Sequence, residues 1–135
     1  MGKRTTSRRL AMQALYQVDL SGSDPDSALL SVSSEEKFPG ETIDFAGKLL
    51  DGVLKNKDRI DKEISKRLDA WQLQRLSIVD KNIIRVAVYE MLSDDKTPFS
   101  AVINEAVELA KKFGGMESKK FVNGVLSSVA KGLKL

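Results

Sequence analysis

Hydrophobic positions in this chain recur at the three- and four-residue spacing of amphipathic helices. Residues 41–54, 60–68, 98–113 and 117–131 each place their apolar side chains on one helical face. Sustained alternation of apolar and polar residues, which is typical of half-buried β-strands, does not occur in the sequence. The pattern therefore predicts an all-α protein.

Residues that cap or interrupt helices mark where these helices begin and end. Thr5 or Thr6 can cap a first helix, which is expected to end before the turn-rich segment Ser21-Gly22-Ser23. Asp24-Pro25 combines a capping residue with a first-turn proline, and Gly114-Gly115 is typical of a helix C-terminus. Together these signals predict about seven helices.

The length of 135 residues favours a single domain, residues 1–135. Within it we expect two small packed helical bundles, an N-terminal lobe of residues 1–66 and a C-terminal lobe of residues 67–135. The longest apolar runs, such as Ile83-Ile84, are far shorter than the ~20 residues of a membrane helix, and residues 1–9 lack the apolar core of a signal peptide. A cytoplasmic protein without a membrane span is therefore expected.

The composition removes the commonest catalytic side chains. The sequence contains no cysteine and no histidine, which excludes thiol and imidazole nucleophiles and zinc sites built from these residues. Glu35-Glu36 and Asp94-Asp95 are adjacent carboxylates, and adjacent residues on a helix point apart, so a solvated surface is the favoured interpretation. Glycine-rich phosphate-binding loops are also absent. We expect neither an enzyme nor a cofactor or metal site.

Positive charge is concentrated at the two ends of the chain. Residues 1–18 contain four basic residues and no acid, and residues 111–135 contain six lysines and one acid, whereas the intervening segment is net acidic. If the fold brings the two ends together, they would form one basic patch. The alternative is a pair of solvated basic tails.

The first predicted helix combines cations with side chains that can contact bases. Arg4 and Arg8 are one helical turn apart, Arg9 lies alongside, and Gln13 and Tyr16 continue the same helix. Clustered cations bind phosphates, whereas aromatic and amide side chains bind unstacked bases. This helix is therefore a candidate RNA-binding element.

A second candidate lies at the start of the last predicted helix, where Lys119 and Lys120 precede Phe121. Phe121 is about 100° away from the apolar stripe that begins at Val122, so both core packing and stacking on a base are open to it. Its border position beside two lysines favours partial exposure and RNA contact. Gly124, which lowers helix propensity, is explained most simply by close helix packing.

Four segments resemble the NusB family of bacterial transcription antitermination factors. They are RRLAMQALY at 8–16, WQLQRLSIVDKNIIR at 71–85, INEAVELAKKFG at 103–114 and KFVNGVL at 120–126. The resemblance extends over essentially the whole chain in order, although residues 21–66 match only in their helical pattern.

This resemblance implies an all-α, two-bundle fold and a non-enzymatic role in antitermination on ribosomal RNA operons. It implies binding of boxA-type single-stranded RNA together with NusE, a ribosomal protein, within a transcription elongation complex that contains other Nus factors. Members of the family occur as monomers and as homodimers, so a homodimer is one of two expected states.

The resemblance also assigns candidate site residues. The family's basic N-terminus and its base-contacting positions correspond to an RNA-binding set: Lys3, Arg4, Arg8, Arg9, Gln13, Tyr16, Lys119, Lys120 and Phe121. Its partner surface corresponds to the polar side of one helix: Asp80, Lys81, Ile84 and Arg85.

Two alternative functions follow from the same residues. A helical protein–protein adaptor that binds no RNA would be favoured if the two basic ends lay far apart in the fold. An accessory domain of an rRNA-modifying enzyme is the other alternative, because NusB-like bundles also occur fused to rRNA methyltransferases. That alternative is expected to need a cofactor-holding segment after Leu135.

Overall fold

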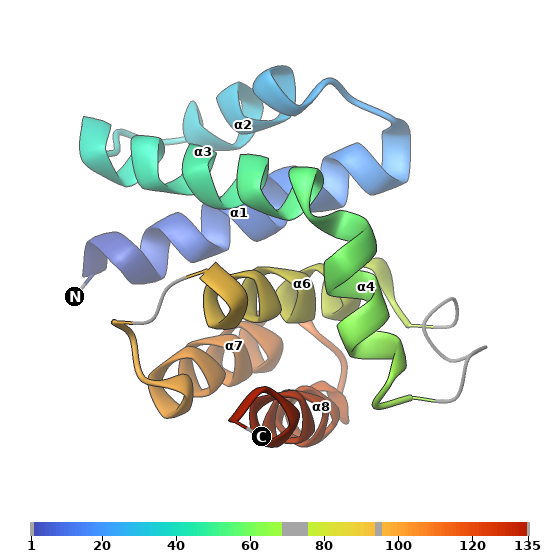
Figure 1. Cartoon of the computed structure of the whole chain (residues 1–135). Helices are drawn as coiled ribbons and strands as arrows, with labels where there is room; N and C mark the ends of the chain where they lie inside the picture. Colours follow the sequence, from blue (N-terminus) through green and yellow to red (C-terminus); the bar gives the residue numbers. More distant parts are fainter. Residues whose placement is uncertain (1, 69–75, 94–95, 135) are drawn as a thin grey trace.

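The computed structural model describes residues 2–68, 76–93 and 96–134 of the chain (Figure 1). The described residues form seven α-helices and no strand, which confirms the predicted all-α class. The helices are α1 (Gly2–Ser21), α2 (Pro25–Ser33), α3 (Gly40–Lys55), α4 (Lys57–Ser65), α6 (Ile78–Ser93), α7 (Phe99–Phe113) and α8 (Ser118–Lys134).

Helix α1 crosses the middle of the molecule, with α2 and α3 packed on one side and α6 on the other (Figure 1). Helix α6 in turn packs against α7 and α8, and α4 contacts α3, α6 and α8. The buried apolar side chains form one continuous cluster that includes residues from every one of these helices. One shared core therefore spans the proposed boundary between the lobes. The division into two lobes at residue 66 stays a prediction.

Local sequence signals account for several helix ends, but the expectation that Thr5 or Thr6 caps the first helix is wrong, because α1 begins at Gly2. The carboxylate of Asp24 accepts a hydrogen bond of 3.2 Å from the backbone N–H of Ser27, and proline follows as the first helical residue of α2. Helix α1 ends at Ser21, and Gly22 follows it with a φ of 68°, in the left-handed region that favours glycine. The backbone N–H of Gly114 donates to the carbonyl of Ala110 at the end of α7, as the glycine pair predicted.

Candidate nucleic-acid interface

One face of α1 carries three of the predicted RNA-binding residues. Arg9, Gln13 and Tyr16 are each half-buried, and their spacing of four and three residues places them along the same side of the helix. We call these three residues the α1 stripe. The guanidinium of Arg9 lies 5.7 Å from the centre of the Phe38 ring and 3.4 Å from the amide oxygen of Gln13. A cation that is paired with the exposed carboxylate of Glu36 at 3.8 Å, an amide and an aromatic ring thus lie in a row.

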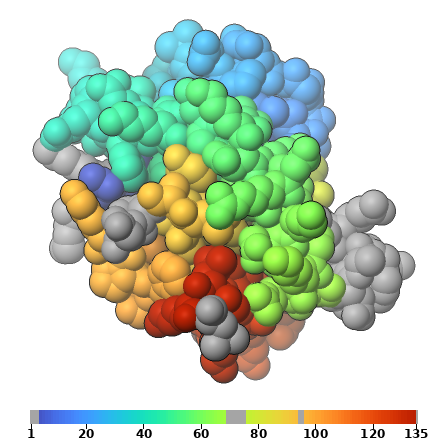
Figure 2. All heavy atoms as spheres, in the orientation of Figure 1, coloured from blue at the N-terminus to red at the C-terminus, as the bar shows by residue number. Residues whose placement is uncertain are grey.

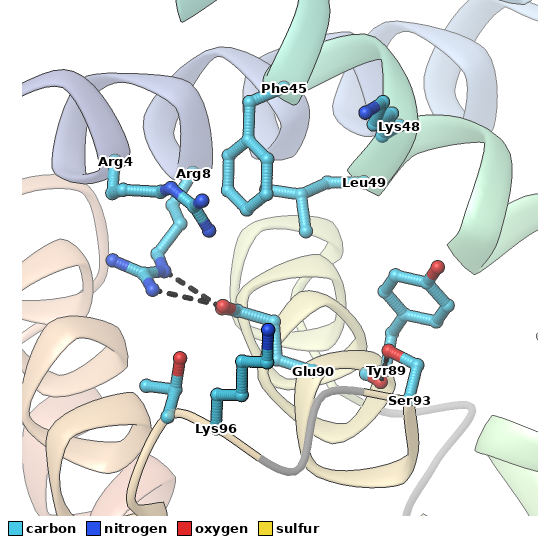
Figure 3. Close-up of a pocket in the computed structure, with 10 residues that line it drawn as sticks. Arg4, Arg8, Phe45, Lys48, Leu49, Tyr89, Glu90, Ser93 and Lys96 are labelled. Carbon is cyan, nitrogen blue, oxygen red and sulfur yellow. Dashed lines mark hydrogen bonds and ion pairs between the residues drawn. The ribbon is translucent and has the colours of Figure 1, made fainter.

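Arg8 does not join this stripe, and its expected role as a phosphate contact is wrong. It is buried between helices, where its Nε and Nη2 donate to the two carboxylate oxygens of Glu90 at 2.8 and 2.9 Å (Figure 3). Its Nη1 donates to Glu105 at 3.0 Å. All three contacts point inward because Arg8 lies about 100° around the helix from Arg9. The guanidinium joins α1 to α6 and α7.

The environment of Arg8 also keeps it charged. Burial alone would lower the pKa of the guanidinium, but the hydrogen bonds and negative charges of Glu90 and Glu105 outweigh that effect and raise its pKa above the ordinary value. A guanidinium with a raised pKa loses its positive charge only at strongly alkaline pH. The contribution of this cluster to the free energy of unfolding is therefore present across the physiological pH range.

Arg4 is exposed and lies on another side of α1. Its guanidinium stacks on Phe45 of α3, 3.8 Å from the ring centre. The side chain of Lys3 lies outside the described part of the structure. Of the four basic residues near the N-terminus, Arg4 and Arg9 are therefore the two that the structure places at the surface.

The start of α8 presents the second predicted group. Lys119 and Lys120 are exposed, and Phe121 is half-buried at the edge of the core, which confirms its predicted partial exposure. The expectation of close helix packing at Gly124 is wrong, because a Cβ atom there would meet no heavy atom within 4 Å. The surface beside Phe121 is therefore open.

The two basic ends of the chain do not merge into one compact patch. The Ser118 hydroxyl donates to Asp80 at 3.0 Å, and Asn82, one half-turn further along α6, donates to Asp19 at 2.9 Å. These contacts place the start of α8 near the C-terminal end of α1. Arg4 precedes Asp19 by fifteen residues, about 22 Å along the helix. Lys119 and Lys120 therefore lie far from Arg4 along the α1 axis, whereas Lys134, at the other end of α8, lies 5.6 Å from the centre of the Phe99 ring at the start of α7.

Two of the four predicted partner-binding residues are not at the surface. Ile84 is fully buried and Arg85 is 6% exposed, so the expectation that they lie on a polar face of their helix is wrong. Arg85 donates to both carboxylate oxygens of Asp61 at 2.8 and 2.9 Å and to Asp19 at 2.9 Å. It thereby joins α6 to α4 and α1, whereas Asp80 and Lys81 are half-buried and keep their predicted role as a proposal.

Comparison with known proteins decides the family. The sequence profile of the NusB family matches residues 5–131. This chain belongs to the NusB family. A transcription antitermination protein NusB from Bacillus cereus is 47% identical over 128 residues, covering 94% of this chain and 96% of that protein. The corresponding protein from Dehalococcoides mccartyi is 43% identical over 133 residues, covering 96% and 93%.

Solved structures share the fold. The antitermination factor NusB, in a crystal structure with NusE and double-stranded RNA, matches with a TM-score of 0.89 and 32% identity, covering 98% of both chains. NusB from T. maritima matches with a TM-score of 0.87 and 36% identity, covering 95% of this chain and 90% of that one. These likenesses confirm the predicted NusB fold.

Within this NusB-family chain, sequence reasoning missed the acidic partners of the two buried arginines. Glu90 and Asp61 neutralise Arg8 and Arg85 from helices remote in sequence. Glu90 follows the apolar run 86–88, and a charged residue in such a position is either exposed or paired inside the protein. The position of Glu90 after this apolar run therefore marks it as a candidate member of a buried ion pair, but it does not identify the residue with which Glu90 pairs.

The carboxylate of Asp80 holds the start of α8. One carboxylate oxygen accepts the Ser118 hydroxyl, and the other is buried without a hydrogen-bond partner within the described residues. We therefore expect Asp80→Lys to lower the free energy of unfolding by about 1–3 kcal/mol, because it removes this bond and forces an ammonium group into the same space. Urea denaturation measures the change. Lys81→Glu is the control, because Lys81 is the next residue and is also half-buried. It should change the free energy of unfolding by less than about 0.5 kcal/mol.

The described residues contain no group of three or more acidic side chains that could hold a metal ion. Among the same residues, no helix combines the length and the apolar character needed to cross a membrane.

Proposed function

We propose that this chain is a transcription antitermination protein that binds boxA-type single-stranded RNA of nascent rRNA transcripts together with NusE. Two groups of side chains carry the proposal, the α1 stripe and the start of α8, and we propose that one RNA strand contacts both along a single RNA path. Along this path Arg9 offers a cation, Gln13 an amide and Tyr16 a ring, and Lys119, Lys120 and Phe121 follow at the far end. The names of the NusB relatives support the antitermination role.

The chemistry of the path favours single-stranded RNA. In a duplex the base edges and faces are occupied, so a protein contacts mainly phosphates and ribose hydroxyls. Gln13, Tyr16 and Phe121 contribute an amide and two rings, which gain most from unpaired bases. The related NusB and NusE were solved with double-stranded RNA, which supports RNA as the ligand class.

The separation of the two basic groups is the arrangement expected to favour an adaptor that binds no RNA, so the remaining side chains must distinguish the two functions. A compact anionic ligand could not contact both Arg4 and Lys119, because they flank opposite ends of α1. An extended polymer can follow the α1 stripe from one end to the other. The half-buried amide and ring of the α1 stripe, which can contact bases, favour RNA over an adaptor that binds only protein.

NusE would complete the binding surface. The accessible cations are few, so the isolated chain is expected to bind RNA weakly and with strong dependence on salt. A partner that holds RNA on its own surface makes the second binding event local and raises the overall affinity. We place this partner at the side of α6 marked by Asp80 and Lys81, and we propose that other Nus factors link the assembly to the cytoplasmic elongation complex.

The proposal is tested by RNA binding at several salt concentrations, with and without NusE. We expect single-stranded boxA RNA to bind more tightly than the same sequence as a duplex, and NusE to increase the affinity for both. Arg9→Gln should weaken binding and reduce the slope of log K against log salt by about 0.7, the value for one phosphate contact on a single strand. Lys62→Gln removes an exposed cation from α4, away from the path, and should leave the slope unchanged.

Two results would contradict the proposal. One is equal affinity for boxA RNA and for an unrelated duplex at every salt concentration. The other is an equal loss of affinity in the Arg9 and Lys62 variants, which would indicate that only the net charge matters.

A further inference from the structure

A cleft of about 650 Å³ opens at the N-terminal end of α1, away from the α1 stripe. It lies between α1, α3 and the end of α6, and six of its lining side chains carry the argument: Arg4, Phe45, Lys48, Tyr89, Ser93 and Lys96 (Figure 3). Arg4 and Arg9 are five residues apart, which separates their directions by about 140° around the helix. In the space-filling view, the blue start of α1 is visible between α3 and the gold segment near the end of α6 (Figure 2).

Cations approach this cleft from three separate elements. Arg4 comes from α1, Lys48 from α3, and Lys96 from the connection between α6 and α7 (Figure 3). Among the described lining residues the only acid is Glu90, and both of its carboxylate oxygens already accept hydrogen bonds from Arg8. An anion that entered the cleft would therefore meet cations on several sides and a neutralised carboxylate at its base.

Other acids near the cleft limit the strength of this attraction without removing it. Glu41 and Asp44 line a neighbouring hollow that shares Arg4, Phe45 and Lys48 with the cleft. In the sequence, Asp94 and Asp95 lie between Ser93 and Lys96, outside the described residues. Binding of an anion by charge alone would consequently be weak, and a second kind of contact is needed for a specific site.

Flat surfaces in the cleft supply that second contact. The Arg4 guanidinium lies over the Phe45 ring, and an arginine plane stacked on a ring can in turn accept a base on its other face. Tyr89 forms a fixed wall, because its ring packs directly on the backbone of α3 at Gly52. A Cβ atom at Gly52 would collide with Tyr89 Cζ, so the ring occupies the space of a side chain there.

We propose that this cleft is a binding site for a nucleotide. The base stacks on Arg4 over Phe45, and Lys48 and Lys96 bind the phosphate, with the Ser93 hydroxyl beside it. An acidic peptide would use the cations but leave the stacking surface empty, so the combination favours a phosphorylated aromatic ligand. The nucleotide can be free, or it can be a residue of an RNA chain that continues beyond the N-terminal end of α1.

The site is tested by NMR titration of the full chain with adenosine 5′-monophosphate, adenosine, inorganic phosphate and a short single-stranded RNA. We expect the monophosphate to shift backbone amides around Phe45, Lys48 and Ser93 more strongly than either adenosine or phosphate alone. Lys48→Gln should raise the apparent dissociation constant by about fivefold, as expected for one lost charged contact. Lys55→Gln removes an equally exposed lysine two turns further along α3, outside the cleft, and should change nothing.

A second variant separates stacking from charge. Phe45→Leu keeps an apolar side chain under Arg4 but removes the ring, so it should weaken binding of the monophosphate while leaving the response to inorganic phosphate unchanged. Far-UV circular dichroism of each variant establishes that it remains folded.

The arms of the titration distinguish the two sources of the nucleotide and the failure of the proposal. Shifts caused by the monophosphate indicate a free nucleotide, and shifts caused only by RNA indicate a residue of the chain; either result supports the site. Equal shifts from inorganic phosphate, adenosine monophosphate and a glutamate peptide would overturn it, as would unchanged binding in Lys48→Gln. Because the cleft lies apart from the α1 stripe, loss of RNA binding in Tyr16→Ala with intact cleft titration would concern the proposed function alone.

Discussion

Replacing Arg8 with alanine is expected to lower the free energy of unfolding by about 3–5 kcal/mol, the range for breaking a buried ion pair from one side. The reason is the carboxylate that remains. Glu90 is 3% exposed, and Arg8 supplies hydrogen bonds to both of its oxygens. Without the guanidinium, a negative charge would be left inside the protein with no compensating donor. Urea denaturation of the variant and the parent protein measures the change.

A double substitution provides the control for this prediction. Arg8→Met combined with Glu90→Leu removes both charges and keeps apolar volume between α1, α6 and α7, so it should recover much of the lost stability. If Arg8→Ala were as stable as the parent, the ion pair would contribute nothing. Glu105 is half-buried and also contacts Arg8, so Glu105→Gln should have a smaller effect than loss of Arg8.

The fold was predictable because its determinants are local. Apolar spacing within 41–54 and 98–113 decides which face of each helix is buried, and the caps at Asp24 and Gly114 act on backbone groups three or four residues away. These interactions depend only on near neighbours in the chain. A single sequence therefore contains enough information to identify the helices, whereas the arrangement of the helices came from the family resemblance.

The site was predicted less completely because its outcome depends on partners far away in the sequence. Arg8 and Arg9 are adjacent and chemically identical, yet only Arg9 is accessible. Arg8 points inward from its own position on the helix, and there it pairs with Glu90, which lies 82 residues further along the chain; helical spacing contains no information about that partner. The same holds for Arg85, whose burial depends on Asp61 and Asp19 in other helices. Partial exposure of Phe121 was predictable because it follows from the helix's own apolar stripe.

Phe121 is the residue of the proposed RNA path for which the largest loss of affinity is expected. We expect Phe121→Ala to lower the affinity for single-stranded RNA by about 1–3 kcal/mol, the range for one base stacked on an aromatic side chain. The ring is half-buried, Lys119 and Lys120 beside it are exposed, and the open surface at Gly124 leaves room for a base. Fluorescence anisotropy with boxA RNA and NusE measures the loss.

Stability must be measured alongside affinity, because Phe121 also packs against the core. A fully buried phenylalanine would lose about 3–5 kcal/mol on truncation, and partial burial should make the loss smaller. Val122→Ala is the matched control: its side chain is fully buried in the next position of α8, so it should lower stability without changing the RNA affinity of the folded protein. If Phe121→Ala were strongly destabilised while its folded fraction bound RNA normally, Phe121 would be a core residue only. RNA binding at this end of the path would then depend on Lys119 and Lys120 alone, and removal of both lysines should reduce the slope of log K against log salt by about 1.4, the value for two phosphate contacts on a single strand.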